Sequence, residues 1–413
     1  MGGWKYVPRL VARPLERALA TSPVVVLMGA RQTGKTTLVQ SEPYLSDRLY
    51  LTLDDLDTRE QARKSPEDVV KSATRVTLDE VQREPGVLHA VKRAVDSDRP
   101  RKTGRFLLTG SANLLLMRRV SETLAGRATY VQLWPLTRSE RIGLGACGIW
   151  TDLLATPVSG WPKLFESSES QPADWRDEAA RGGYPTPALE LDGHEARALW
   201  FDGYVRTYLE RDLQDVAFIR DVVNFRRAMR ATCLTIGTVL NQSRLGRDTG
   251  IPRATLQRYL DLMESCYQLV RVPAFSVNRT KRLVKSPRVY WSDPALALWL
   301  SGSRAALGAH LENLVLSDLL AWRDSLLPAP DVLHWRTSTA QEVDFVIESG
   351  SRLLAIEVKA SSNPGHRATR GLRAFRQEYD SDGRFAGGLL LNCGKQTRWM
   401  SDRILAVPWW KVL

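Results

Sequence analysis

Residues 29–36 have the sequence Gly29-Ala30-Arg31-Gln32-Thr33-Gly34-Lys35-Thr36. It satisfies the pattern GxxxxGK[ST], in which glycines let the backbone wrap a phosphate so that successive N–H groups point inward. The β-branched run Val24 to Met28 precedes it, and a helical pattern begins near Lys35. This order of strand, loop and helix predicts a phosphate-binding loop.

Side chains of this loop have separate expected roles. Lys35 is expected to reach the β- and γ-phosphates of ATP, and the Thr36 hydroxyl to ligate Mg²⁺. The other residues assigned to nucleotide binding here are Gly29, Arg31, Gln32, Thr33, Gly34 and Thr37. ATP and Mg²⁺ are therefore the expected cofactors.

Two further apolar strands are expected to end in polar groups. Val76-Thr77-Leu78 is followed by Asp79 and Glu80. Asp79 is expected to bind Mg²⁺ through water, and Glu80 to polarise the attacking water. A strand over 106–109 ends in hydroxyl groups, so Thr109 and Ser111 are the candidates for a polar sensor between Glu80 and the γ-phosphate; an ordinary strand-end turn is the alternative.

The arrangement of apolar runs predicts an α/β fold. Runs at 49–53, 76–78 and 106–109 lie between helical segments, which is typical of a mostly parallel sheet with helices on both faces. Residues 143–175 are rich in Gly, Ser, Pro and Trp, and we expect a loop or insertion there before a helical lid. Another α/β pattern follows residue 294, with strands expected at 343–347, 353–358 and 388–391.

Composition narrows the class of partner. The 413 residues include 58 Lys and Arg against 46 Asp and Glu, a formal charge of +12, which favours a polyanion such as nucleic acid over a merely soluble surface. The four cysteines are too scattered for metal knuckles or a disulfide framework, so a reducing cytoplasm is expected. No apolar run is long enough to cross a bilayer, and we expect no membrane association.

The middle of the chain predicts a winged helix-turn-helix. A helical block over 195–240 is followed by two helices within 243–262, joined by the turn Gly250-Ile251-Pro252. Cations on the second helix and on a following wing hairpin suit contact with DNA phosphates, although such motifs also dock proteins. These cations are Arg253, Arg258, Arg279, Lys281, Arg282, Lys285 and Arg288.

The last region carries a second set of chemical groups. Asp344 and the run Ile356-Glu357-Val358-Lys359 lie on two expected strands, with Glu312 upstream on a helix. Strand alternation places Glu357 and Lys359 on one face, and Asp344 opposite Val343 and Phe345. This pattern resembles the PD-(D/E)xK nuclease fold. The resemblance implies that Asp344 and Glu357 hold Mg²⁺, that Lys359 orients or activates water, and that Glu312 supports the metal shell. Cutting and simple nucleic-acid binding both stay open.

Taken together, the motifs resemble a widespread bacterial and archaeal family in which an AAA-type ATPase domain precedes a C-terminal domain of unknown function. The residues that carry the resemblance outside the loop are Arg9, Leu78-Asp79-Glu80-Val81-Gln82, Leu108-Thr109-Gly110-Ser111, Leu124-Ala125-Gly126-Arg127, Leu136, Gly182-Gly183-Tyr184-Pro185 and Thr207-Tyr208-Leu209-Glu210-Arg211-Asp212. The family implies an AAA+ core with a helical lid and a ring-like homo-oligomer. Arg127 is then the expected arginine finger, with Arg118 and Arg119 as rivals, and Arg181 a candidate nucleotide sensor in the lid.

These expectations define four segments and three functional hypotheses. The segments are an ATPase core over 1–142, an insertion and helical lid over 143–222, a winged helix-turn-helix over 223–292 and a PD-(D/E)xK-like domain over 293–413. The leading hypothesis is an ATP-hydrolysing AAA+ protein that remodels or translocates on DNA, including forked or branched DNA. The alternatives are an ATP-gated DNA-binding regulatory switch and an ATP-controlled, metal-dependent nuclease.

Overall fold

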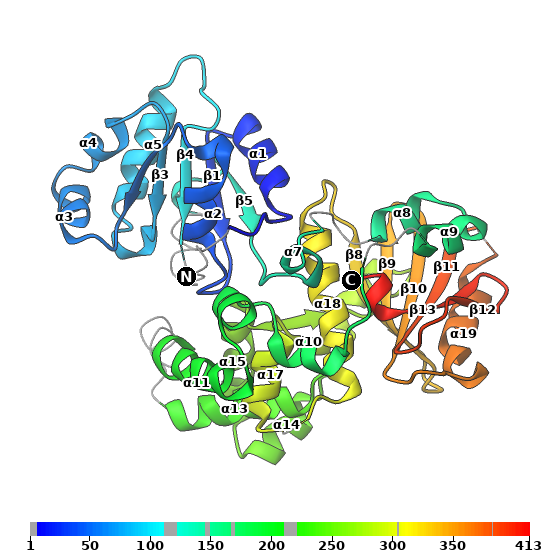
Figure 1. Ribbon diagram of the computed structural model, residues 1–413. Helices are drawn as coiled ribbons and strands as arrows, with labels where there is room; N and C mark the ends of the chain where they lie inside the picture. Colours follow the sequence, from blue (N-terminus) through cyan, green and yellow to red (C-terminus); the bar gives the residue numbers. More distant parts are fainter. Residues whose placement is uncertain are drawn as a thin grey trace.

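The computed structural model describes residues 6–110, 122–144, 149–166, 170–209, 221–303, 305–381 and 383–413. Its N-terminal part is built on a five-stranded parallel sheet (Figure 1). The strand order is β2 (Leu49–Thr52), β3 (Val76–Asp79), β4 (Phe106–Thr109), β1 (Val24–Met28) and β5 (Ala128–Gln132). The predicted α/β core is confirmed, and β4 lies between the strands that carry the loop and the carboxylates.

Helices cover both faces of this sheet because alternate residues of β1 point in opposite directions. Val24 and Val26 pack with α4 (Pro66–Lys71) and α5 (Val87–Ser97). Val25 and Leu27 pack with α1 (Ala12–Thr21) and α2 (Lys35–Ser41). The short helix α3 (Leu56–Lys64) precedes α4. All five residues of β1 are buried, as expected for the central part of a two-faced parallel sheet.

The segment 143–175 is largely helical where the structure describes it, so the expectation of a loop is wrong there, whereas that of an insertion stays a prediction. It holds α8 (Trp150–Ala155), α9 (Trp161–Glu166) and the start of α10 (Trp175–Arg181). Trp150 and Leu153, three residues apart on α8, are buried, and so is Trp161 at the start of α9. The burial of these apolar side chains favours helices more than the local content of Gly, Ser and Pro favours a loop. Helices α8 and α9 lie beside the C-terminal sheet (Figure 1), where the Trp161 ring covers Gly387 so closely that a Cβ there would lie 2.4 Å from it.

A helical layer follows, made of α11 (His194–Tyr204), α13 (Val222–Leu234), α14 (Gln242–Thr249) and α15 (Arg253–Ser265). Strands β6 (Leu269–Val272) and β7 (Arg288–Trp291) form a two-stranded antiparallel sheet beside them. The basic segment between these strands differs from the expected hairpin, because residues Arg279–Val284 form helix α16, which Asn278 caps with its side-chain oxygen.

The C-terminal part holds a six-stranded mixed sheet. Its order is β12 (Arg398–Ser401), β13 (Ile404–Pro408), β11 (Phe385–Asn392), β10 (Arg352–Lys359), β9 (Glu342–Ser349) and β8 (Asp331–Arg336). Helix α19 (Arg370–Tyr379) covers one face. The other face packs on α18 (Gly308–Asp324), which follows α17 (Pro294–Ser301).

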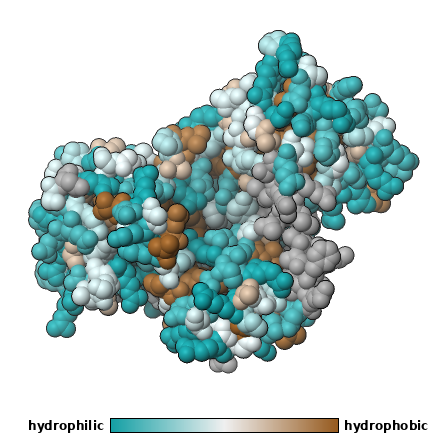
Figure 2. All heavy atoms as spheres, turned by 180° about the vertical axis from the view of Figure 1, so that it is seen from behind, coloured by the Kyte–Doolittle hydropathy of each residue, from teal (hydrophilic) through white to brown (hydrophobic). Residues whose placement is uncertain are grey.

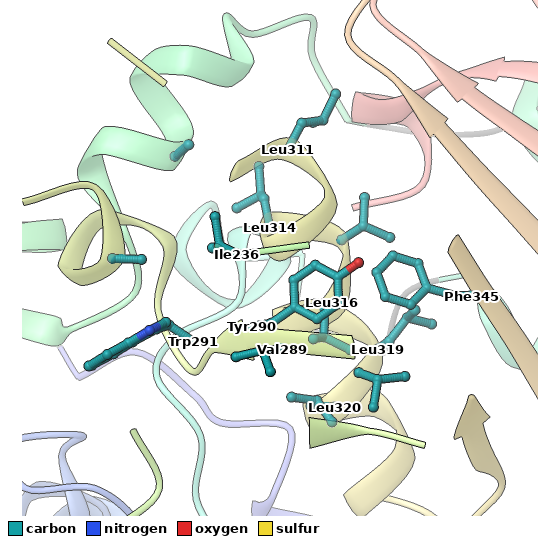
Figure 3. Close-up of a cluster of buried hydrophobic side chains, with 14 of the residues drawn as sticks. Ile236, Val289, Tyr290, Trp291, Leu311, Leu314, Leu316, Leu319, Leu320 and Phe345 are labelled. Atoms are coloured by element: carbon teal, nitrogen blue, oxygen red, sulfur yellow. The ribbon is translucent and has the colours of Figure 1, made fainter. Parts of the chain in front are cut away.

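A large cluster of buried apolar side chains is centred on α18. Figure 3 shows Leu316 and Leu319 of this helix near Tyr290 of β7 and Phe345 of β9, with Leu311 farther along the helix. The same cluster continues through the middle helices to Trp134, next to the N-terminal sheet. Trp134 lies in the first segment expected from the sequence, so one hydrophobic core is shared by all four of these segments, whose boundaries remain predictions.

The outer surface is mainly polar. On the face in Figure 2, hydrophilic side chains predominate, and apolar ones gather near the middle of the molecule. Within the described ranges, no helix combines the length and apolar character that crossing a bilayer requires.

Candidate nucleotide site

The phosphate-binding loop connects β1 to α2 and depends on two glycines. Gly29 has φ of 156°, and a Cβ built on it would lie only 2.2 Å from the carbonyl oxygen of Leu133. Gly34 has φ of 92° and caps the N-terminus of α2. A larger residue would clash at Gly29 and would be strained at Gly34. The two glycines therefore allow the backbone of the loop to approach a phosphate closely.

Lys35 lies inside the loop. Its Nζ donates to the carbonyl oxygens of Gly29, at 3.1 Å, and Ala30, at 2.8 Å. Burial lowers the pKa of Lys35 to about 8, although the nearby carboxylates of Glu80 and Asp79 favour its charged form. The ammonium group of Lys35 therefore lies on the loop. Its positive charge and the backbone N–H groups at the start of α2 both favour the binding of an anion there.

Asp79 is the centre of a hydrogen-bonded group at the carboxyl ends of the strands. Its Oδ2 accepts from the Thr36 hydroxyl and from the Tyr50 hydroxyl, each at 2.7 Å. Its Oδ1 accepts from the Thr109 hydroxyl. Thr36 and Asp79 thus meet as predicted, and Thr109, whose role as a sensor stays a prediction, also contacts Asp79. Hydroxyl and carboxylate oxygens are the ligands that suit Mg²⁺.

Tyr50 is a site residue that sequence reasoning missed. The apolar run over 49–53 predicts its strand, but not that β2 pairs directly with β3, where Tyr50 lies opposite Thr77. Its phenol then reaches Asp79, and burial, followed by this hydrogen bond, raises the pKa of Tyr50.

Glu80 directly follows β3 in a left-handed backbone conformation, with φ of 57°. Its carboxylate accepts a hydrogen bond from the Gln82 side-chain amide. Burial raises the pKa of Glu80, because the charged form loses water, while Lys35 opposes this effect. Such a turn aims the carboxylate away from the strand. Ser111, the second expected sensor, lies outside the described residues.

Arg9 connects the phosphate-binding loop to the segment after β5 through hydrogen bonds of its guanidinium group. Its guanidinium donates to the carbonyl oxygens of Thr33, at 2.9 Å, and Trp134, at 2.7 Å, and its Nε lies 3.2 Å from Glu140. Arg9 and Glu140 are both buried. One side chain therefore ties the loop to the segment that follows β5.

The middle helices also contact the loop. Tyr204 of α11 donates to the carbonyl oxygen of Arg31 at 3.3 Å, and Pro185 lies next to Gly34. The carbonyl oxygen of Gly183 accepts a hydrogen bond from the backbone N–H of Leu136, and the Gly183 N–H donates to buried Asp293 at 2.6 Å. The Gly182-Gly183-Tyr184-Pro185 segment is thus held against the loop. Arg181 ends α10 and donates to the Ala188 carbonyl oxygen at 3.4 Å.

Arg127 lies at the opposite edge of the sheet. It precedes β5, whose first residue pairs with Val24 at the start of β1, whereas the loop follows the end of β1. Its guanidinium binds both oxygens of Asp96, at 2.6 and 2.9 Å. A strand of this length places Arg127 roughly 15 Å from its own loop. Its assignment as an arginine finger stays a prediction, and the rivals Arg118 and Arg119 lie outside the described residues.

The cations predicted to contact DNA fall into two groups. Arg253, Arg258, Arg279 and Lys281 are exposed. Arg282 differs, because its largely buried guanidinium binds Glu348, at 2.5 Å, and Asp331, at 3.4 Å. Arg253 also lines an open groove of about 950 Å³, together with Arg244 and Arg336.

The C-terminal candidates converge. Asp344, Glu357, Lys359 and Glu312 interact electrostatically in one buried cluster. Among the described residues, no three His, Cys, Asp or Glu side chains are grouped so as to hold a metal ion, and the roles expected for these four residues stay predictions.

The fold and the loop define a P-loop ATPase of the AAA type. Residues 21–142 match a family model described as "AAA domain". Residues 172–307 and 307–412 match two described as "Domain of unknown function", DUF8612 and DUF4143.

Relatives extend this match along the chain. Uncharacterised proteins of Mycobacterium tuberculosis and Mycobacterium bovis are each 30% identical over 410 residues, covering 97% of this chain and 83% of theirs. The chain belongs to the family of these proteins, which joins an AAA domain to a C-terminal DUF4143 domain.

Solved structures give weaker similarity. A Walker-type ATPase of Pyrococcus abyssi is 18% identical, with a TM-score of 0.43, over 70% of this chain and 94% of that one. A RuvB variant of Thermotoga maritima is 18% identical, with a TM-score of 0.29, over 67% of this chain and 94% of that one.

Proposed function

We propose that the chain hydrolyses ATP to ADP and phosphate and couples this reaction to DNA. The observation that carries the first part is the 2.7 Å hydrogen bond between Thr36 and Asp79, which brings the end of the loop to the carboxylates of β3. Thr36 and Asp79 would hold Mg²⁺, which supplies charge neutralisation for the phosphates when bound. Glu80, with its raised pKa, is a suitable base for orienting water.

Lys35 has to exchange partners when nucleotide binds. Its bonds to Gly29 and Ala30 stabilise the loop without phosphate, and phosphate oxygens are stronger acceptors for an ammonium group than carbonyl oxygens are. The Lys35→Ala variant is expected to lose ATP binding and hydrolysis together.

DNA is the proposed partner because of the basic groove. Arg244, Arg253 and Arg336 come from α14, α15 and the end of β8, so cations from both the helical layer and the C-terminal sheet face one open space. Exposed Arg258 and the exposed cations of α16 add to this positive charge. Phosphate contacts of this kind make affinity strongly dependent on salt.

A ring-like homo-oligomer is proposed for the active form. Arg127 is too far from its own loop to assist hydrolysis there, so it can act only on the nucleotide of a neighbouring chain. Mixing the Lys35→Ala and Arg127→Ala variants, each inactive alone, should restore part of the activity. An Arg127→Ala variant with full activity would exclude this role.

The decisive experiment is the ATPase rate without nucleic acid and with single strands, duplex, a fork and a four-way junction. Strong stimulation by one DNA form, absent in Lys35→Ala, is expected and would identify the substrate. The Arg253→Ala/Arg336→Ala variant should lose stimulation but keep the basal rate. A rate that no DNA form changes would contradict the coupling.

A slow, ATP-gated switch is the second candidate, favoured by the Gln82–Glu80 hydrogen bond, which engages the proposed base. If Gln82 restrains Glu80, Gln82→Ala should raise the basal rate severalfold and reduce the further stimulation by DNA. An unchanged basal rate would contradict this restraint.

A further inference from the structure

The C-terminal carboxylate cluster contains a cation from outside its own sheet. Arg288, the first residue of β7, is buried at 3% exposure. Its Nη1 lies 2.7 Å from Oδ1 of Asp344, and its Nη2 lies 2.8 Å from Glu342. The helical layer therefore inserts a guanidinium group among the carboxylates of β9.

Both oxygens of Asp344 are occupied by this arrangement. Oδ1 binds Arg288, and Oδ2 accepts the backbone N–H of Val358 at 2.8 Å. The guanidinium group of Arg288 thus places a positive charge on Oδ1 of Asp344, where a divalent ion would have to displace it or share this oxygen with it.

The remaining acids of the cluster are only partly satisfied. Glu312 accepts from the Tyr290 hydroxyl at 2.9 Å, and Tyr290 is held by the packing seen in Figure 3. Oε1 of Glu357 binds Lys359 at 2.5 Å. Oε2 of Glu357 has no hydrogen-bond partner, and it is buried, since the whole residue is only 5% exposed. A buried carboxylate oxygen without a partner is costly, so this position favours a cation, a water molecule or a proton on the carboxyl group.

The charges of the cluster are unbalanced even with Arg288 present. Burial, and then the charge of Asp344, raise the pKa of both Glu312 and Glu357. Removal of Arg288 would leave Asp344 without its ion-pair partner in the interior, which is costly unless another cation enters or a carboxyl group of the cluster binds a proton.

We propose that Arg288 is the resident cation of this cluster, takes the place of a divalent metal ion, and keeps the site closed to Mg²⁺ and Mn²⁺. Neutralising Arg288 converts the cluster into a divalent-cation site made of Asp344, Glu357 and Glu312. This inference is independent of ATP hydrolysis. The residues on both sides of Arg288, Pro287 and Val289, line the basic groove, so the closed cluster lies beside the proposed DNA surface.

The test measures Mn²⁺ binding to the nucleotide-free full chain, from the loss of the free Mn²⁺ signal in electron paramagnetic resonance. The Glu357→Gln substitution alone should leave the Mn²⁺ binding of the chain at the wild-type level. Arg288→Gln should gain one site per chain, at least about tenfold stronger than any in the wild type. Arg288→Gln/Glu357→Gln should lose it again.

Arg282→Gln is the matched control, since it removes another buried, ion-paired arginine that faces Glu348 and Asp331 instead of the cluster. It should gain no Mn²⁺ site. A wild-type chain that binds Mn²⁺ through Glu357 would overturn the proposal, and so would a folded Arg288→Gln variant without the new site. If Arg288→Gln does not fold alone, folding restored by Mn²⁺ supports the proposal, and failure to fold with Mn²⁺ contradicts it.

Discussion

The indole N–H of Trp134 donates to Oδ2 of Asp324 at 2.6 Å, and the carbonyl oxygen of the same Trp134 accepts from Arg9. Arg9 in turn holds Thr33 in the phosphate-binding loop. One residue therefore connects the loop to the last turn of α18, whose other end carries Glu312 of the carboxylate cluster.

Trp134→Phe is expected to weaken the stimulation of ATP hydrolysis by DNA severalfold while leaving the basal rate nearly unchanged, because it removes the donor and keeps most of the apolar packing. The measurement is the ratio of stimulated to basal rate. Trp150→Phe is the control: Trp150 donates in the same way to Asp318 of α18, at 2.6 Å, without contacting Arg9. An equal effect of both variants would contradict a specific link through Trp134.

Tyr50→Phe should weaken the binding of Mg²⁺-ATP about fivefold, the equivalent of about 1 kcal/mol for one hydrogen bond. The missing donor leaves Asp79 held by Thr36, Thr109 and the backbone N–H of Glu80. Titration calorimetry measures the change. Tyr44→Phe, which loses a bond to the Ala12 carbonyl oxygen at 3.0 Å instead, should bind as the wild type does.

ATP affinity should decrease as the pH rises above about 8. Lys35 has a pKa lowered to about 8, so it loses its proton there in the nucleotide-free chain, and Kd should increase up to about tenfold per pH unit. Lys35→Arg should bind with a flat profile, because arginine stays charged. A wild-type profile as flat as that of Lys35→Arg would show that Lys35 keeps its proton.

The same pKa has a consequence for stability with the opposite sign. Between about 8 and 10.5 the unfolded chain holds the Lys35 proton more tightly than the folded chain. The contribution of Lys35 to the free energy of unfolding therefore increases with pH across this range. Comparing the pH dependence of urea unfolding in the wild type and Lys35→Ala isolates this contribution.

Arg9→Ala should destabilise the chain by about 3–5 kcal/mol, since it leaves Glu140 buried without its ion-pair partner. Arg127→Ala breaks the more exposed pair with Asp96 and should destabilise the chain far less. Urea unfolding of both variants tests the contrast. Equal losses in the free energy of unfolding would mean that Arg9 stabilises the fold no more than a surface arginine does.

The loop and its partners were predictable because they depend on short local patterns. GxxxxGK[ST] after a buried strand, and carboxylates after another, predict that Thr36 and Asp79 meet at one edge of a parallel sheet, as they do. Tyr50 and Arg9 were not assigned roles at this site, because their contacts depend on strand order and on a segment more than a hundred residues away.

Strand alternation failed at Asp344 for a local reason. Opposite it, the register between β8 and β9 shifts, so that Leu333 pairs with Val346 and Trp335 with Val343. Such a bulge interrupts the twofold period. Val343 accordingly packs with the α19 cluster, whereas Phe345 packs with α18, against the prediction that both share one face.

Arg288 shows a different limit of the sequence. Its neighbours Arg279, Lys281 and Lys285 are exposed cations, and nothing in the local pattern separates Arg288 from them. Only the tertiary contact between β7 and β9 reverses its environment from solvent to a buried ion pair.

The continuous core around α18 determines how the chain can be divided. Side chains from Trp150 through Tyr290 to Val407 belong to one buried cluster, so a cut near residue 142 or 307 would expose apolar surface on both products. Fragments made from the family boundaries should therefore aggregate or need their missing half in trans, and beyond the N-terminal sheet the chain should melt in a single calorimetric transition.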